Sequence, residues 1–308
     1  MARRRKGRPV HGWVVLDKPA GVTSAQAVAR VRRTLDAAKA GHAGTLDPLA
    51  TGVLPIALGE ATKATTYLVD AEKVYRFVVR WGLATATDDA EGDVTETSGA
   101  RPDAAAIAAV LPRFVGAIEQ VPPAFSAIKV DGERAYALAR ADRAPELASR
   151  TVQVESIELC GRPDPDHAEF LVRCGKGTYI RALARDIAVA LGTVGHVAGL
   201  RRTAVGPFTE AVAISLDDFE GLGGSAAASH HLLPVETVLD DIPALAVTES
   251  EAGRLRRGQP VPVIRKANRE CIEALADGAV LSALHDRRLV AFVRLDGRMV
   301  HPVRVLNH

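Results

Sequence analysis

The sequence contains few cysteines, few aromatic residues and no long hydrophobic run. Its three cysteines, Cys160, Cys174 and Cys271, lie far apart and include no CxxC pair, which excludes a zinc knuckle and a disulfide framework. No apolar stretch approaches the roughly 18 residues that a membrane helix needs. The apolar run WVVL at residues 13–16 is too short for a signal-peptide core. These absences predict a protein of the reducing cytoplasm with no membrane partner.

The formal charge of the chain is close to balance, with 39 basic and 37 acidic side chains. Five of the basic side chains lie within residues 3–8, so the remainder of the chain carries a slight excess of acid. Any affinity for a polyanion must therefore come from local patches.

The first part of the chain predicts strands separated by one helix. WVVL at residues 13–16 is typical of a buried strand, and a helix is expected after an N-cap at Ser24. Residues 53–58 form a second predicted strand, in which Pro55 indicates a sheet edge or a bulge. Residues 73–81 alternate apolar and polar side chains and predict the clearest strand.

The rest of the chain continues this alternation and then changes character. Helices are expected at residues 102–114 and 181–191, and strands are expected at residues 151–159 and 169–173. Residues 122–150 form a polar insertion with a helical bias, and GLGGSAAAS at residues 221–229 is linker-like. Short alternating segments in residues 271–305, from IEALA to VHPVRVL, predict a small β-barrel. Together they indicate an α+β protein, a mixed-sheet domain followed by a compact, mostly β appendage.

The loop GHAGTLDPLATG at residues 41–52 carries one histidine and one aspartate among glycines and a proline. Asp47 is either an Asx-turn or capping residue, or a carboxylate nucleophile or general base held where it can reach a substrate atom. His42 is either a hydrogen-bonded structural residue or part of the same site. The loop alone does not decide between these interpretations.

The segment GKGTYIRALARDI at residues 175–187 places Tyr179 and Arg181 between a strand and a helix. Arg181 and Arg185 are either solvated helix charges, or Arg181 points into a cleft as a counter-ion. A cation close to a carboxylate favours its ionised form. GKGT lacks the upstream glycine of a phosphate-binding Walker loop.

The acidic run GLATATDDAEGD at residues 82–93 does not match the spacing of an EF-hand loop. It is interpreted as a surface turn, with Asp89 as a possible partner for an arginine and with no metal site. The basic residues are either solvated charges or, since several lie near the loops above, part of a groove that follows phosphates; besides the N-terminal tail, they are Arg30, Arg32, Arg33, Lys63, Lys129, Arg201 and Arg202. Tyr75 and Phe125 are either core residues or platforms on which bases stack.

Seven sequence blocks resemble the bacterial tRNA pseudouridine synthases of the TruB type, which make pseudouridine at position 55 in the T loop. The blocks are GWVVLDKPAGVTS, AGHAGTLDPLATGVLPIALGEATK, KVYRFVVRWG, TATDDAEG, QVPPAFSAIKVDGERAYALAR, CGKGTYIRALARDI and GHVAGLRRTAVGPF. They lie in family order over nearly all of residues 11–208. The resemblance implies a mixed, mostly antiparallel central sheet of the pseudouridine synthase type, and a PUA-like, RNA-binding C-terminal domain.

The resemblance also implies roles for single residues. Asp47 matches the catalytic aspartate, and Arg181 matches the arginine paired with it. Tyr75 matches the aromatic residue that stacks on the target uracil and is a candidate for proton removal. Asp89 is expected to complete the charge network, and His42 to fill the space that the flipped base leaves.

Further positions are expected to bind the RNA. Tyr179 and Leu200 match residues that line the pocket, and Lys129 is expected to meet phosphate. Residues 122–150 match the segment that closes over the T stem-loop. The implied division of the chain is a basic tail at residues 1–9, a catalytic domain at 10–228 and a C-terminal domain at 229–308.

The implied reaction needs no metal or cofactor, and its partner is the T stem-loop of tRNA. The protein is predicted to be a cytoplasmic monomer with no obligate protein partner. Two mechanisms stay open: attack of the aspartate on the sugar or base, and formation of a glycal-like intermediate. An RNA-binding folding factor in which modification is secondary is the alternative, and the same chemistry on another RNA is a third possibility.

Overall fold

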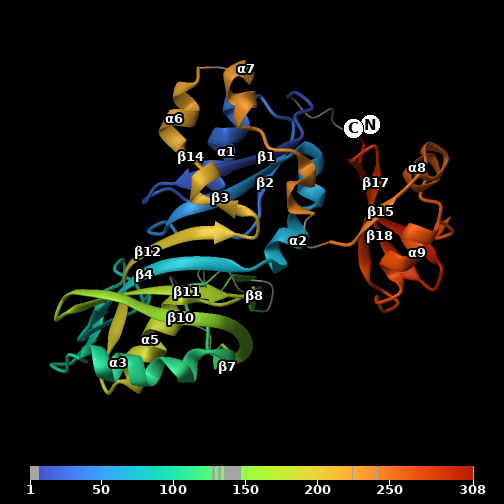
Figure 1. Cartoon of the computed structure of the whole chain (residues 1–308). Helices are drawn as coiled ribbons and strands as arrows, with labels where there is room; N and C mark the ends of the chain where they lie inside the picture. The colour runs from blue at the N-terminus through green and yellow to red at the C-terminus, as the bar shows by residue number, and fades with distance from the viewer. Residues whose placement is uncertain are drawn as a thin grey trace.

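The computed structural model describes residues 7–126, 129–130, 133–134, 147–223, 225–239 and 242–307. Two main sheets dominate the fold, and Figure 1 shows them as a larger body and a smaller one drawn in orange and red. The expected α+β class, with a mixed central sheet and a mostly β C-terminal part, is confirmed. Within the described residues, no helix has the length and apolar character needed to cross a membrane.

The larger sheet has the order β14-β1-β3-β12-β4-β11-β10-β7, with β2 added beside β3 and β13 beside β12. The β1–β14 and β3–β12 pairs are parallel, and its other described pairs are antiparallel. Its strands are β1 (Gly12–Lys18), β2 (Ala40–His42), β3 (Thr51–Leu58), β4 (Lys73–Trp81), β7 (Gly116–Gln120), β10 (Arg150–Asp164), β11 (His167–Cys174), β12 (Gly195–Val205), β13 (Phe208–Thr209) and β14 (Ile214–Ser215). The strand expected at residues 73–81 is confirmed.

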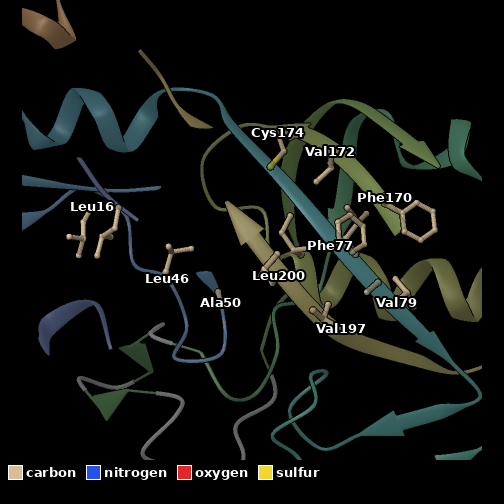
Figure 2. Close-up of a cluster of buried hydrophobic side chains, with 14 of the residues drawn as sticks. Leu16, Leu46, Ala50, Phe77, Val79, Phe170, Val172, Cys174, Val197 and Leu200 are labelled. Carbon is tan, nitrogen blue, oxygen red and sulfur yellow. The ribbon is translucent and has the colours of Figure 1, made fainter. Parts of the chain in front are cut away.

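Helices cover the larger sheet. Its helices are α1 (Ser24–Thr34), α2 (Thr65–Asp70), α3 (Ala104–Val110), α5 (Ile180–Ala190), α6 (Leu216–Gly221) and α7 (Ser225–Ala228). Two hairpins complete the larger part: β5 (Leu83–Thr85) with β6 (Val94–Thr97), and β8 (Lys129–Val130) with β9 (Glu133–Arg134). Phe77 and Val79 of β4 pack with Phe170 of β11 in the buried core, as Figure 2 shows.

The start of α1 differs from the prediction by one residue. The N-cap is Thr23, whose side chain accepts from the backbone N–H of Gln26 while the Gln26 side chain accepts from the Thr23 N–H. This capping box satisfies two N–H groups that a helix start otherwise leaves without partners. Ser24 is therefore released from capping, and its hydroxyl bonds to Leu46 instead.

The expectation that Pro55 marks a sheet edge or a bulge is wrong, because β3 lies between β1 and β12 and its pairing with β1 is regular. The Pro55 carbonyl accepts from Ala43 N–H on the side away from β1. The amide and carbonyl of one strand residue point to the same side, so the missing N–H of the proline removes no bond to β1.

The expectation of a linker at residues 221–229, which rested on composition, is also wrong. Residues 225–228 form α7, and Ala228 is fully buried in the main core. Three consecutive alanines favour a helix, and this propensity outweighs the neighbouring glycines.

The smaller sheet has the order β15-β17-β18-β19-β16. Its elements are β15 (Ala244–Ala246), α8 (Glu249–Arg256), β16 (Val261–Pro262), α9 (Lys266–Ile272), β17 (Val280–His285), β18 (Arg288–Asp296) and β19 (Met299–Val305). The segment IEALA, expected as a strand, instead begins with the last residue of α9. The two parts meet where Tyr67 stacks on Phe292, with ring centroids 4.1 Å apart. The division at residue 228 stays a prediction.

Candidate active site

The loop that carries Asp47 joins β2 to β3, and we call residues 43–50 the Asp47 loop. Its backbone is held from several sides although its sequence is rich in glycine. The Ser24 hydroxyl donates to the Leu46 carbonyl at 3.0 Å and accepts from the Leu46 N–H at 2.9 Å. The Leu46 side chain is buried, and the Pro48 carbonyl accepts from the Gly21 N–H at 2.8 Å. The aspartate is thus presented on fixed backbone.

Two buried cations also bind this loop through backbone oxygens. The ammonium of Lys18, which is fully buried, donates to the carbonyls of Pro19, Val22 and Pro48. The guanidinium of Arg202, which is 1% exposed, donates to Val53 O at 2.8 Å and to Gly44 O at 3.1 Å. Neither cation has an ion pair with a carboxylate among the described residues.

Asp47 and Arg181 form an ion pair. The Oδ2 atom of Asp47 lies 2.9 Å from Nη2 of Arg181, and the side chains are 35% and 5% exposed. The carboxylate is therefore partly open to solvent, whereas the guanidinium behind it is buried. This geometry lets a ligand reach the carboxylate while the arginine keeps it oriented.

The Arg181 guanidinium has further partners that fix its plane. Nη1 lies 3.4 Å from Oδ2 of Asp89 and donates to the Thr87 carbonyl at 2.8 Å. Nη2 also donates to the Phe125 carbonyl at 2.9 Å. Asp89 is 4% exposed in its side chain, and its Oδ1 accepts from Thr87 Oγ1 and from the Glu91 N–H. One buried cation thus binds two carboxylates.

Tyr75 lies half-buried on β4 beside Arg202 of β12. Burial raises the pKa of the Tyr75 phenol, and the nearby charge of Asp47 adds to this, while Arg202 opposes it. The phenol is therefore protonated at neutral pH. Leu200 of β12 belongs to the same buried cluster as Leu46 of the Asp47 loop (Figure 2).

His42 ends β2, just before the Asp47 loop. Burial, with a further contribution from the Arg202 charge, lowers the pKa of its imidazole, so the ring is neutral at neutral pH. Its Nδ1 atom is buried and has no hydrogen-bond partner among the residues that the structure describes. A buried polar atom without a partner is unusual and is available to a ligand.

The structure describes the other predicted site residues to different extents. Tyr179 is the residue before α5, and the Arg150 guanidinium carbon lies 4.8 Å from the centre of its ring. Lys129 lies in β8, but its side chain falls outside the described residues. The structure brings Asp47, Asp89 and Arg181 into direct contact.

Several basic residues of the predicted groove already have partners within the chain, and the groove itself stays a prediction. Arg202 is buried, and Arg201 pairs with Asp17 at 2.8 Å and with Glu210. Arg30 pairs with Glu220. The Lys63 ammonium likewise pairs with the Glu60 carboxylate and donates to the Val305 carbonyl. Charge in the sequence does not reveal whether a side chain is already neutralised.

Sequence reasoning gave no role to Lys18, and it placed Ser24 at a helix start and Arg202 in a groove, whereas both bind the Asp47 loop. The alternation of β12 offers one signal, because Arg202 is two positions from Leu200 and so shares its face of the sheet. The described side chains contain no group of three or more histidine, cysteine, aspartate or glutamate residues placed to hold a metal ion.

Comparison with known families gives matches over two adjoining stretches. Residues 32–180 match the TruB family pseudouridylate synthase N-terminal domain, and residues 181–240 match the tRNA pseudouridylate synthase B C-terminal domain. The chain is 54% identical over 307 residues to tRNA pseudouridine synthase B of Rhodospirillum rubrum, covering 100% of each chain. It is 53% identical over 308 residues to that of Caulobacter vibrioides, covering 100% of this chain and 99% of the relative.

A solved structure shares the fold. A crystal structure of a Cbf5-Nop10-Gar1 complex contains a chain that is 28% identical to this one. The TM-score is 0.73, and the match covers 96% of this chain and 84% of the other.

Proposed function

Because the chain belongs to the TruB family of pseudouridylate synthases and is therefore a tRNA pseudouridine synthase, an isomerase, we propose that it converts uridine to pseudouridine at position 55 in the T loop of tRNA. Asp47 is the proposed catalytic carboxylate. The observation that carries this assignment is the contact between a partly exposed Asp47 and a buried Arg181, 2.9 Å apart.

The reaction exchanges one bond for another within a single nucleotide. The bond between N1 of uracil and C1′ of ribose breaks, the base turns, and a bond from C5 to C1′ forms. The proton on C5 is lost and N1 gains one, so the atoms and charges balance without a second substrate. A carboxylate beside C1′ or the base serves either as a nucleophile or as a base that leads to a glycal-like intermediate.

The target base lies inside a folded loop and must be flipped out, at a cost of a few kcal/mol. We assign Tyr75 to stacking on the flipped uracil, and its protonated phenol fits a hydrogen-bonding role there. His42 fills the space that the base leaves, and a neutral imidazole can enter a base stack without the cost of burying a charge. Leu200 and Tyr179 line the pocket, Lys129 meets phosphate, and Asp89 steadies Arg181.

The decisive experiment replaces Asp47 with asparagine, which has nearly the same shape. The carboxamide of the Asp47→Asn variant cannot carry the negative charge, so pseudouridine formation in an unmodified tRNA transcript is expected to fall by at least about 1000-fold. The dissociation constant for the RNA is expected to change by less than about threefold, because phosphate and shape contacts supply the affinity.

Asp217→Asn is the matched control, since that side chain is 92% exposed. It should retain the wild-type rate. A wild-type rate in Asp47→Asn would refute the assignment of Asp47. The monomeric state and the cytoplasmic location stay predictions.

A further inference from the structure

The insertion at residues 122–150 leaves and rejoins the sheet beside the first turn of α5, which carries Arg181. We call residues 120–126 the N-terminal root of the insertion and residues 147–151 its C-terminal root. Both roots are bonded to residues 177–185. This arrangement, combined with the proposed function, gives a role to Gln120, the first residue of the block QVPPAFSAIKVDGERAYALAR.

Gln120, the last residue of β7, is 1% exposed and bonds to both backbone groups of Tyr179. Its Oε1 accepts from the Tyr179 N–H at 2.8 Å, and its Nε2 donates to the Tyr179 carbonyl at 3.1 Å. Tyr179 is the N-cap of α5 and makes no capping bond with its own side chain. A carboxamide presents one acceptor and one donor side by side, so Gln120, on β7, reaches both backbone groups of Tyr179. Its Oε1 satisfies one of the N–H groups that a helix start leaves without a partner, whereas the Tyr179 carbonyl also accepts from the Leu183 N–H of α5.

The N-terminal root is held further along by two arginines of α5. The Phe125 carbonyl accepts from Arg181, the same guanidinium that contacts Asp47. The Val121 carbonyl accepts at 2.8 Å from Arg185, one helical turn later. The backbone that leads into the insertion is thereby tied to the guanidinium that orients the catalytic carboxylate.

The C-terminal root returns to the same place. The Arg150 guanidinium donates to the Gly177 carbonyl at 2.7 Å and lies over the Tyr179 ring. The hydroxyls of Ser149 and Thr151 both donate to the carboxylate of Glu119, the neighbour of Gln120. Tyr179 is therefore held at its backbone from one root and at its ring from the other.

We propose that Gln120 is a positioning residue of the active site, which fixes the Tyr179 backbone and so aims both the Tyr179 ring and Arg181 toward the substrate cleft. The inference rests on the proposed function. A buried amide that served stability alone could bond to any nearby carbonyl. Gln120 instead bonds to both backbone groups of Tyr179, two residues before Arg181, where a displacement of about 1 Å can cost on the order of 100-fold in rate.

The test uses Gln120→Met in the full-length protein, because methionine has a similar volume and makes neither hydrogen bond. The single-turnover rate at saturating T stem-loop RNA is expected to fall on the order of 10- to 100-fold. The dissociation constant for that RNA is expected to change by less than about threefold, since phosphate contacts remain. Gln153→Met, at an exposed glutamine on the neighbouring strand β10, is the matched control and should keep the wild-type rate.

Thermal unfolding of each variant separates positioning from stability. A Gln120→Met protein that is fully folded at the assay temperature and still slow supports the proposal. A rate that returns to the wild-type value once the variant is assayed well below its unfolding midpoint overturns it.

Arg150→Met is a second variant at a less buried position, with little risk to folding. It releases the Tyr179 ring and is expected to lower the same saturated rate by about two- to fivefold. Wild-type rates in both Gln120→Met and Arg150→Met would refute the positioning role.

The wild-type protein is the reference for the proposed function itself. If it makes no pseudouridine, the proposed function fails, whereas an active wild type beside an equally active Gln120→Met protein removes only this inference.

Discussion

The cations around the Asp47 loop fall into two groups that differ in what they bind. Arg181 binds two carboxylates, Asp47 and Asp89. Lys18 and Arg202, which we call the carbonyl-bound cations, donate to backbone oxygens of the loop and its neighbours. All three side chains are buried, so burial alone does not distinguish a residue of the chemistry from a residue of the scaffold. The partner does.

The two groups carry different electrostatic costs. A guanidinium beside a carboxylate is compensated for the loss of water by an opposite charge, whereas a carbonyl offers only a dipole. The cost is visible at Lys18, where burial lowers the pKa to about 8 and the negative charge of Asp47 offsets only part of the effect. The carbonyl-bound cations hold the loop in shape, and Arg181 holds the charge that the loop presents. Substitution of Arg181 should therefore lower mainly the reaction rate, whereas substitution of a carbonyl-bound cation should lower mainly the free energy of unfolding.

The largest effect is expected from Arg181→Lys. A lysine keeps the positive charge, but one ammonium cannot reach Asp47, Asp89 and two carbonyls in the fixed plane of a guanidinium. The single-turnover rate on the T stem-loop should fall by about 100-fold or more. Arg76→Lys, at an exposed ion pair with Glu169, is the control and should keep its rate. A loss of less than about threefold in Arg181→Lys would remove the distinction between the two groups.

A smaller effect, of a different kind, is expected from Arg202→Met. The substitution leaves Gly44 O and Val53 O without their donor, although it also removes a buried charge. The free energy of unfolding, measured with urea, should fall by roughly 1 to 3 kcal/mol. The rate of the folded variant should fall less than in Arg181→Lys, because Asp47 keeps its partner.

Arg201→Met provides the matched control at the next position of β12. Arg201 pairs with Asp17 and Glu210, and all three side chains are about a third exposed or more. Loss of such exposed pairs should cost only about 0 to 1 kcal/mol. Equal losses in Arg201→Met and Arg202→Met would contradict the scaffold role of Arg202.

These neighbouring arginines also show what a sequence can and cannot predict. Strand β4 could be predicted because alternation is a local property of residues 73–81. The difference between Arg201 and Arg202 is set by which face of β12 meets the Asp47 loop, and that depends on pairing with strands far away in sequence. For the same reason the contact of Asp47 with Arg181 followed from the family resemblance, while the residue types alone left it open.

The errors have a common physical cause. Composition suggested a linker at residues 221–229, and the glycines of the Asp47 loop gave no sign of a fixed backbone. In both, bonds or packing from distant residues override the local tendency: Ser24 fixes the loop, and Ala228 is buried in the core. Gln120 begins the block QVPPAFSAIKVDGERAYALAR, but sequence reasoning gave it no role because its partner, Tyr179, lies 59 positions later.

A further effect concerns pH, and it tests whether a carbonyl-bound cation is as poorly compensated as its pKa suggests. Burial lowers the pKa of Lys18 from its ordinary 10.5 to about 8, so between these values the unfolded chain binds more protons than the folded protein. Folding stability from this group therefore rises with pH across that window, is fully present above about 10.5 and is lost as pH falls through about 8. The slope is at most about 1.4 kcal/mol per pH unit.

Urea unfolding of wild type and Lys18→Met at several pH values within that window measures this slope as a difference. The subtraction is needed because burial raises the pKa of Cys174 to about 11, which makes stability fall with pH over much of the same range. Lys18→Met should lack the rising contribution, so the two curves should diverge as pH increases. Lys176→Met, at a lysine whose side chain is 67% exposed, should run parallel to wild type. Parallel curves for Lys18→Met would mean that its three carbonyls compensate the ammonium as fully as carboxylates do for Arg181.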